Sequence, residues 1–226
     1  FTLLNSPDEA VVARSVAELR YHAGVLDLMG LDTTAKIQIH VGGMYRDREA
    51  AIRRFLDRVT DLDEGILRRL AIENDDLRFS LADCLRIHAE TALPVILDTF
   101  HHELNHRRET LSEAIDTAAG TWSGADGIPL VDYSSQEEGR RRGSHAASLD
   151  PENFRRFLRA SRHHDLDVML EIKRQGEERP PGTGYRGKGF EAHPSDPTGF
   201  GRHEKKGSFE ASGKVCMMAE SYREEG

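Results

Sequence analysis

The sequence has little of what marks secreted, membrane-spanning and nucleic-acid-coating proteins. Its two cysteines, Cys84 and Cys216, cannot form a disulfide framework, and free thiols favour the cytosol. No apolar run approaches the roughly 18–20 residues of a membrane span, and no secretory leader opens the chain, so we expect a cytoplasmic protein without membrane contact. The net charge of −8 lacks the basic excess of a protein that coats nucleic acid, although it is compatible with a partner whose phosphates are met by bound metal ions.

The end of the chain lacks branched aliphatic residues. Residues 174–226 contain no Leu and no Ile, but they hold 10 of the 20 Gly and 4 of the 8 Pro. Such a segment buries too little apolar area to offset the entropy lost on ordering. We therefore expect one folded domain over residues 1–173 and an irregular, disordered tail over residues 174–226. The nine acidic and nine basic residues of the tail cancel, so the domain carries the whole net charge.

Short apolar runs alternate with longer segments of helical period over residues 1–173. The strand candidates are Phe1–Asn5, Lys36–Val41, Leu70–Glu73, Pro94–Phe100, Pro129–Tyr133 and Asp167–Ile172. The helix candidates are Pro7–Met29, Asp47–Val59, Ser80–Thr91, Thr110–Ala119 and Pro151–Arg162. This alternation predicts an α/β fold with a parallel sheet covered by helices. An open doubly wound sheet and a barrel both fit, but no glycine-rich nucleotide-binding motif follows any strand candidate, which disfavours the nucleotide-binding versions.

Potential metal ligands stand at or just after the ends of the strand candidates. They are His40, Glu73, Asp98, His101, Asp132, His145 and Glu171. The carboxyl ends of the strands of a parallel barrel open on one face, where active sites form. The four carboxylates would repel one another strongly without cations, and buried Asp and Glu are rare unless they are paired or bound to metal.

These ligand types together favour a multi-metal centre of mixed His and carboxylate ligands. Such ions acidify water and stabilise the charge that builds on a phosphoryl group. Taken singly, a strand-end carboxylate more often caps the following helix, and a histidine such as His40 is more often a hydrogen-bonded core residue. Five successive strands that each deliver an ionisable group favour the metal centre, but their spacing does not say which metal is bound.

Seven segments that contain or flank these residues occur in the order typical of the ultraviolet-damage endonuclease family (UvdE, UvsE). The segments are Leu3-Leu4-Asn5-Ser6, Ile39-His40-Val41-Gly42-Gly43, Leu70-Ala71-Ile72-Glu73-Asn74-Asp75, Asp98-Thr99-Phe100-His101-His102, Tyr133-Ser134-Ser135-Gln136, Gly143-Ser144-His145 and Met169-Leu170-Glu171-Ile172-Lys173. Each is weak alone, but seven in order are a specific signal. The chain therefore resembles this family of metal-dependent DNA repair enzymes, which are related in fold to endonuclease IV.

The resemblance implies a TIM-type (β/α)8 barrel with two or three divalent metal ions per chain, commonly manganese. His40 and Glu73 would hold one ion, with Glu73 bridging to a second ion. The remaining ligands of the second ion would be Asp98, His145 and Glu171. His101 would bind the third ion. The catalytic candidates are Glu73 and Lys173; Lys173 is placed to reach a phosphate, although a solvated strand-end lysine is an equally good interpretation.

The chain also departs from the family pattern. The family often has Lys-x-His at the strand where this chain has Leu130 and Asp132; Asp132 can still bind a cation, whereas Leu130 cannot. The chain starts inside what resembles the third barrel strand, and the similarity stops at Lys173. We therefore expect an incomplete barrel of about six strand–helix units, with a tail from Arg174 that looks like a different reading frame or a mispredicted gene end.

The function implied by the resemblance is incision of damaged double-stranded DNA on the 5′ side of ultraviolet photoproducts, with no obligatory protein partner. Substrate phosphates would be met by Arg140, Arg141 and Arg142, although the default interpretation of such a run is a solvated loop. Two alternatives remain. One is a metal-dependent sugar isomerase or epimerase on the same barrel type, which would not need the Tyr-Ser-Ser-Gln segment. The other is an inactive remnant or a binding partner only.

Overall fold

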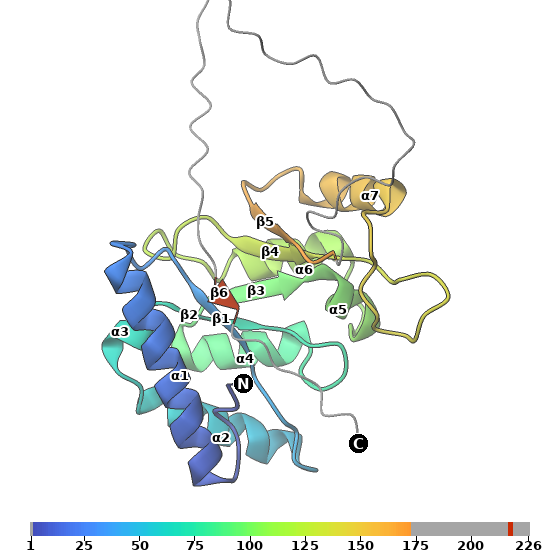
Figure 1. Cartoon of the computed structure of the whole chain (residues 1–226). Helices are drawn as coiled ribbons and strands as arrows, with labels where there is room; N and C mark the ends of the chain where they lie inside the picture. The colour runs from blue at the N-terminus through green and yellow to red at the C-terminus, as the bar shows by residue number, and fades with distance from the viewer. Residues whose placement is uncertain (1, 173–216, 219–226) are drawn as a thin grey trace, which may run out of the picture. The chain divides into compact units, whose positions relative to one another are not determined.

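The computed structural model describes residues 2–172 and the backbone of Met217–Met218. Over residues 2–172 it contains five strands, which are β1 (Ile37–His40), β2 (Leu70–Glu73), β3 (Val95–Asp98), β4 (Leu130–Tyr133) and β5 (Asp167–Leu170). Strands that follow one another in sequence pair in parallel (Figure 1). A sixth strand, β6 (Met217–Met218), pairs in parallel with β1, so the sheet order is β5-β4-β3-β2-β1-β6. The expected parallel α/β sheet is confirmed.

Helices connect the strands and cover the sheet. They are α1 (Glu9–Leu28), α2 (Arg48–Thr60), α3 (Glu64–Leu67), α4 (Leu81–Thr91), α5 (Thr99–Leu104), α6 (Leu111–Ala119) and α7 (Pro151–Ser161). Four of them follow the strand order, because α2 packs on α4, α4 on α6 and α6 on α7. Local sequence fixes their starts: Thr110 and Glu113 form a capping box at α6, and Asp150 caps α7 ahead of Pro151. Among the helices that the structure describes, none is both long enough and apolar enough to cross a membrane.

The two faces of the strands have different roles. Ile37 and Ile39 of β1 belong to the hydrophobic core that the sheet shares with the helices. By strand alternation, Gln38 and His40 point to the opposite face. The Gln38 amide donates a hydrogen bond to Asp132 of β4, although β2 and β3 lie between β1 and β4 in the sheet. The sheet therefore curls around this polar face, as a segment of a barrel wall does.

The chain start differs from the expected strand Phe1–Asn5, because Thr2–Asn5 is not a strand. The Leu3 amide donates to the Ser15 hydroxyl of α1 at 2.9 Å, and the Ser6 amide donates to the Leu3 carbonyl at 3.1 Å, which closes a turn. Leu4 is buried in the core all the same. The apolar run is therefore explained by packing of an irregular segment, so the prediction of a strand there is wrong.

Two short helices were not expected, and one expected strand is shorter than its apolar run. Helix α3 lies between α2 and β2, and α5 begins at Thr99, inside the predicted strand Pro94–Phe100. The expected irregular tail, 174–226, contains the two-residue strand Met217–Met218, which corrects the expectation at that point. The other tail residues lie outside the described part of the chain, so the expectation for them stays a prediction.

Candidate metal centre

Strand register brings the candidate ligands together at the carboxyl ends of the strands. His40 of β1 lies opposite Glu73 of β2, and Asp98 of β3 lies opposite Asp132 of β4. The remaining candidates come from segments that follow strands: His101 from α5, His145 from the loop after β4, and Glu171 from the end of β5. Parallel strands thus deliver seven candidate ligands to one end of the sheet, as the sequence predicts.

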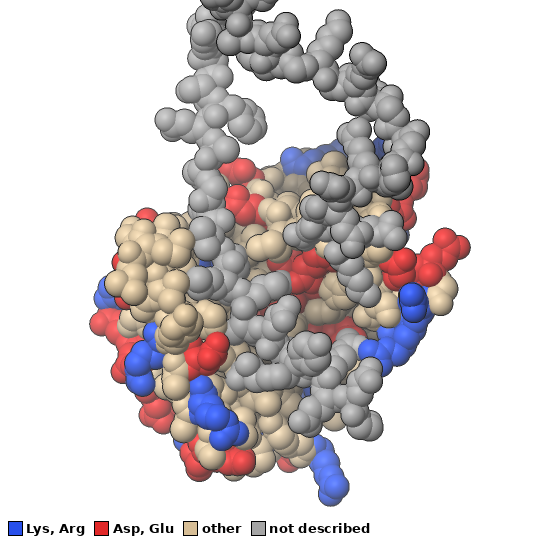
Figure 2. Space-filling view, viewed as in Figure 1, with Lys and Arg blue, Asp and Glu red and all other residues tan. Residues whose placement is uncertain are grey.

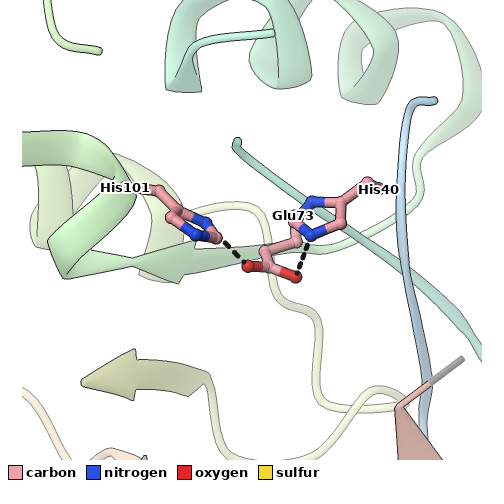
Figure 3. A group of neighbouring side chains, drawn as sticks. All are labelled: His40, Glu73 and His101. Carbon is pink, nitrogen blue, oxygen red and sulfur yellow. Dashed lines mark ion pairs between the residues drawn. The ribbon is translucent and has the colours of Figure 1, made fainter. Parts of the chain in front are cut away.

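The first group of possible ligands is His40, Glu73 and His101 (Figure 3). The Glu73 carboxylate lies between the two imidazoles: its Oε2 is 3.5 Å from His40 Nε2, and its Oε1 is 3.2 Å from His101 Nδ1. The three ligand atoms lie within 4.8 Å of one another. Each oxygen of the carboxylate faces a different histidine, which is the arrangement that a bridging carboxylate needs.

The second group is Asp98, His101 and His145. Asp98 Oδ2 is 3.0 Å from His101 Nδ1, and the His101 and His145 rings are 5.6 Å apart between centroids. His145 Nδ1 is in turn 3.4 Å from Glu171 Oε2, so Glu171 extends this group. His101 belongs to both groups, whereas the resemblance assigns it to a separate third ion. The distribution of the ligands among ions therefore stays a prediction.

Asp98 has a different task for each of its oxygens. Its Oδ1 accepts the backbone N–H groups of Phe100 and His101 at 2.7 and 2.8 Å, and it thereby caps α5. Its Oδ2 faces His101 Nδ1. The carboxylate that starts the helix therefore also fixes the position of the histidine that this helix carries into the site.

Buried charge shifts the protonation of His101 and Asp98 in opposite directions. Burial by itself lowers the pKa of His101, but the carboxylates of Asp98 and Glu73 outweigh it and raise that pKa to about 12. Burial raises the pKa of Asp98, but His101 and hydrogen bonds to it outweigh burial and leave the pKa below its usual range. A proton on His101 therefore offsets part of the negative charge of Asp98 and Glu73, and a bound cation would offset that charge in its place.

Asp132 is the carboxylate with the least compensation. It is fully buried, and burial together with the charges of Glu73, Glu171 and Asp98 raises its pKa well above the usual range. Its Oδ2 accepts a hydrogen bond from the Gln38 amide. Within the part of the chain that the structure describes, its Oδ1 has no hydrogen-bond partner.

Orphaned polar atoms indicate that the site fits divalent cations. Besides Asp132 Oδ1, the buried atom His40 Nδ1 forms no hydrogen bond with any described residue, and Asp98 Oδ2 has only its ion pair with His101 among them. Buried polar groups without a hydrogen bond cost free energy, so such a concentration calls for a ligand. Carboxylate oxygens and imidazole nitrogens are suitable ligands for divalent transition metals, and the donor set therefore fits such ions.

The loop after β4 holds both His145 and the predicted phosphate-binding arginines. Gln136 and His145 form an antiparallel bridge across this loop, which directs His145 towards Glu171. Arg140, Arg141 and Arg142 are exposed, and Arg142 donates to the Leu104 carbonyl at 2.7 Å. In Figure 2 basic and acidic side chains meet over this loop at the right-hand border, and acidic side chains are visible near the middle of the described surface. The arginines thus lie beside the site rather than in it.

Two residues at the site were not predicted. The Asn5 amide donates to the Gly43 carbonyl at 2.7 Å and accepts from the Gly43 N–H at 3.1 Å, which holds the loop after His40. Gly42 has φ +113°, and a Cβ there would lie 2.4 Å from Asn5 Oδ1, so only glycine fits. The other missed residue is Gln38; a polar residue two positions before His40 in an apolar strand was the signal for it. Lys173, the second catalytic candidate, lies outside the described residues.

Comparison with known proteins agrees with this geometry. The family model of UV-endonuclease UvdE matches residues 1–178. The UV DNA damage endonuclease of Bacillus cereus (strain Q1) is 33% identical over 177 residues, which are 77% of this chain and 56% of that protein. The enzyme of the same name from Clostridium perfringens (strain 13 / Type A) is 34% identical over 175 residues, 76% of this chain and 42% of that protein. The chain thus spans about half the length of the curated relatives it matches.

Solved structures give the same result for the fold. The crystal structure of SacUVDE is 43% identical, with a TM-score of 0.72 over 76% of this chain and 57% of that chain. The 3-keto-D-glucoside 4-epimerase from E. coli has a TM-score of 0.53 over 78% of this chain and 70% of that chain, but it is only 16% identical, so it shares the fold alone. The likeness in sequence, in fold and in the order of the ligand-bearing segments leads to one conclusion: this chain belongs to the UV-endonuclease UvdE family.

Proposed function

We propose that this chain carries the catalytic metal centre of an endonuclease that nicks damaged double-stranded DNA on the 5′ side of ultraviolet photoproducts. The observation that carries the proposal is the bridging position of Glu73 between His40 and His101, in a chain of the UvdE family. The relatives named UV DNA damage endonuclease support the activity and the substrate. The epimerase likeness concerns the fold alone, and none of the described residues of the site favours a sugar substrate.

The donor set supports two or three divalent ions, with manganese as our first choice. Bound ions would supply an acidified water and stabilise the negative charge that builds on the scissile phosphate. The task of Glu73, Asp98, Asp132 and Glu171 is then to hold those cations. His40, His101 and His145 complete the coordination as neutral imidazoles. Lys173 is proposed to reach a phosphate, and its position at the end of the family segment is the only support for this role.

The charge distribution supports a DNA substrate despite the net charge of −8. Cations bound at the carboxylates would offset part of this charge at the site itself. The exposed Arg140, Arg141 and Arg142 would contact phosphates beside it. A photoproduct weakens local pairing, so the damaged bases leave the stack at a lower cost than intact ones do. Cys84 is a free, buried thiol, which fits the expected cytosolic location.

The decisive experiment compares ultraviolet-irradiated and unirradiated duplexes of the same sequence. The 226-residue chain with added Mn²⁺ should nick the irradiated strand on the 5′ side of the lesion, and EDTA should abolish the nick. Nicking of both duplexes at equal rates would exclude recognition of damage. A protein that binds Mn²⁺ but nicks neither would contradict the proposed activity, and turnover of a ketose instead would establish the isomerase alternative.

A further inference from the structure

The strongest unassigned feature of the site is the Gln38 side chain, which is 2% exposed in the middle of β1. Its Nε2 donates to Glu73 Oε2 at 2.8 Å and also to Asp132 Oδ2. One amide group therefore joins carboxylates from β2 and β4. These two strands are separated by β3, so the contact runs across the curled face of the sheet rather than along a neighbouring pair.

Gln38 acts on the orientation of Glu73. A carboxylate on a flexible side chain can rotate, yet bridging requires that each oxygen face a different ligand group. Glu73 Oε2 is held by Gln38 at 2.8 Å and lies 3.5 Å from His40, which directs Oε1 to His101 at 3.2 Å. Hydrogen-bonding partners of metal ligands commonly fix the ligand in this way.

Gln38 also reduces the repulsion between two carboxylates. Asp132 is fully buried, and its carboxylate and that of Glu73 share the Gln38 amide as a hydrogen-bond donor. The Gln38 NH₂ group places a hydrogen in front of an oxygen of each side chain. An apolar side chain of the same size would leave both oxygens without this donor, and the cost of bringing the two carboxylates together would rise.

We propose that Gln38 is a positioning residue, which holds the Glu73 and Asp132 carboxylates in the arrangement that receives the metal ions. The inference rests on the proposed metal centre and adds a residue that binds no ion itself. Residues of this kind typically contribute about 10–100-fold to metal affinity. Gln38→Met keeps the length of the side chain and removes both donated hydrogen bonds.

Lys36 offers a matched control two residues earlier, immediately before β1. It is also 2% exposed, and its Nζ also donates two hydrogen bonds, to the Arg68 carbonyl and to Asp126. None of these partners is a candidate metal ligand. Lys36→Met therefore removes a buried polar group and two hydrogen bonds without touching the metal centre.

The test is calorimetric titration of the full chain with Mn²⁺ alone, with thermal unfolding of each metal-free variant measured alongside. We expect the Kd of Gln38→Met to rise about 10–100-fold and that of Lys36→Met to stay within about twofold of wild type. An unchanged Kd in Gln38→Met, or an equal rise in Lys36→Met, would overturn the positioning role.

A second variant covers the case in which Gln38→Met does not fold. Gln38→Asn retains an amide but is one methylene too short to reach both carboxylates, so its Kd should also rise, and an unchanged value would contradict the inference. If the wild-type chain binds no Mn²⁺, both the proposed metal centre and the proposed role of Gln38 are contradicted. If the wild-type chain binds Mn²⁺ and the Gln38→Met variant binds it with the same affinity, only the role of Gln38 is contradicted.

Discussion

The two ends of the sheet both contain buried charge, but they compensate it differently. At the amino end, the cations Lys36 and Arg69 meet fixed partners: Lys36 binds Asp126 at 2.6 Å, and Arg69 binds Asp27 at 2.6 Å and three backbone carbonyls. At the carboxyl end, Glu73, Asp98 and Asp132 meet imidazoles, an amide and backbone N–H groups, and none of their described partners is Lys or Arg. The amino end is neutralised by the fold itself, whereas the carboxyl end depends on protons or on added cations.

Among changes that test this difference between the two ends of the sheet, Glu73→Gln at the carboxyl end should have the largest effect. This substitution keeps the shape of the side chain but removes the negative charge that faces both His40 and His101, so nicking of irradiated duplex should fall by at least about 100-fold. Glu64→Gln is the control, because Glu64 is exposed and, among the described residues, forms its ion pair with Arg68. Near-native nicking by Glu73→Gln would rule out the bridging role.

A change of pH should act on the carboxyl end through His101. Asp98 and Glu73 raise the pKa of His101 to about 12 against the effect of burial, so at neutral pH a metal ion must displace a proton from this ring. The affinity for Mn²⁺ should therefore increase by up to about tenfold per pH unit between about pH 6 and pH 8. Titration in buffers of different ionisation enthalpy counts the protons released. A pH-independent affinity without proton release would show that His101 is not a ligand.

The same shift predicts how the stability of the metal-free protein depends on pH. The folded-state pKa of His101 lies above the unfolded value of about 6.5, so the stabilisation from its proton is complete below about pH 6.5 and is lost as the pH rises towards about 12. Denaturant unfolding in EDTA should show this decline. Saturating Mn²⁺ should reduce it, because the cation replaces the proton.

A smaller effect is expected from the arginines beside the site. Replacing Arg140, Arg141 and Arg142 together with Ala should weaken binding of irradiated and unirradiated DNA alike, by about tenfold at moderate salt. The slope of log K against log salt should become shallower by about 2. The metal content should not change. Unaltered DNA affinity and salt dependence would show that the three arginines belong to a solvated loop that does not contact DNA.

The smallest effect on metal binding is expected at the amino end. Lys36→Met leaves the half-buried Asp126 without its cation, so the free energy of unfolding should fall by about 2–3 kcal/mol while the Kd for Mn²⁺ stays unchanged. Chemical denaturation and metal titration of the same preparation check both statements. Loss of metal affinity here would mean that the two ends of the sheet are not independent.

The sequence predicted the regular elements better than it predicted the polar contacts between them. Strands β1 to β5 and the five longer helices follow from apolar periodicity and capping residues, and so does the meeting of ligands at the carboxyl ends. Thr2–Asn5 was mistaken for a strand because its burial comes from contact with α1 and the loop after β1. Helix α5 was missed because its cap, Asp98, lies in an apolar run that reads as a strand.

Gln38 could not be assigned from the sequence because its partners are remote. Glu73 is 35 residues away along the chain and Asp132 is 94 residues away, and only the curl of the sheet brings them together. The spacing of the ligands likewise gave their common location but not their grouping. The sharing of His101 between two groups depends on its contacts with Glu73 of β2 and Asp98 of β3 together, and the contact with Glu73 is not encoded in any local pattern.

The division of labour within Asp98 has a consequence for evolution. One oxygen starts a helix and the other faces the ion site, so an exchange to Asn would keep the start of the helix and lose only the charge. An exchange to Ala would remove both. Asn is therefore the substitution at this position that folding tolerates best, although it removes the charge that metal binding needs. A related sequence with Asn here would be expected to fold but to lack the enzymatic activity.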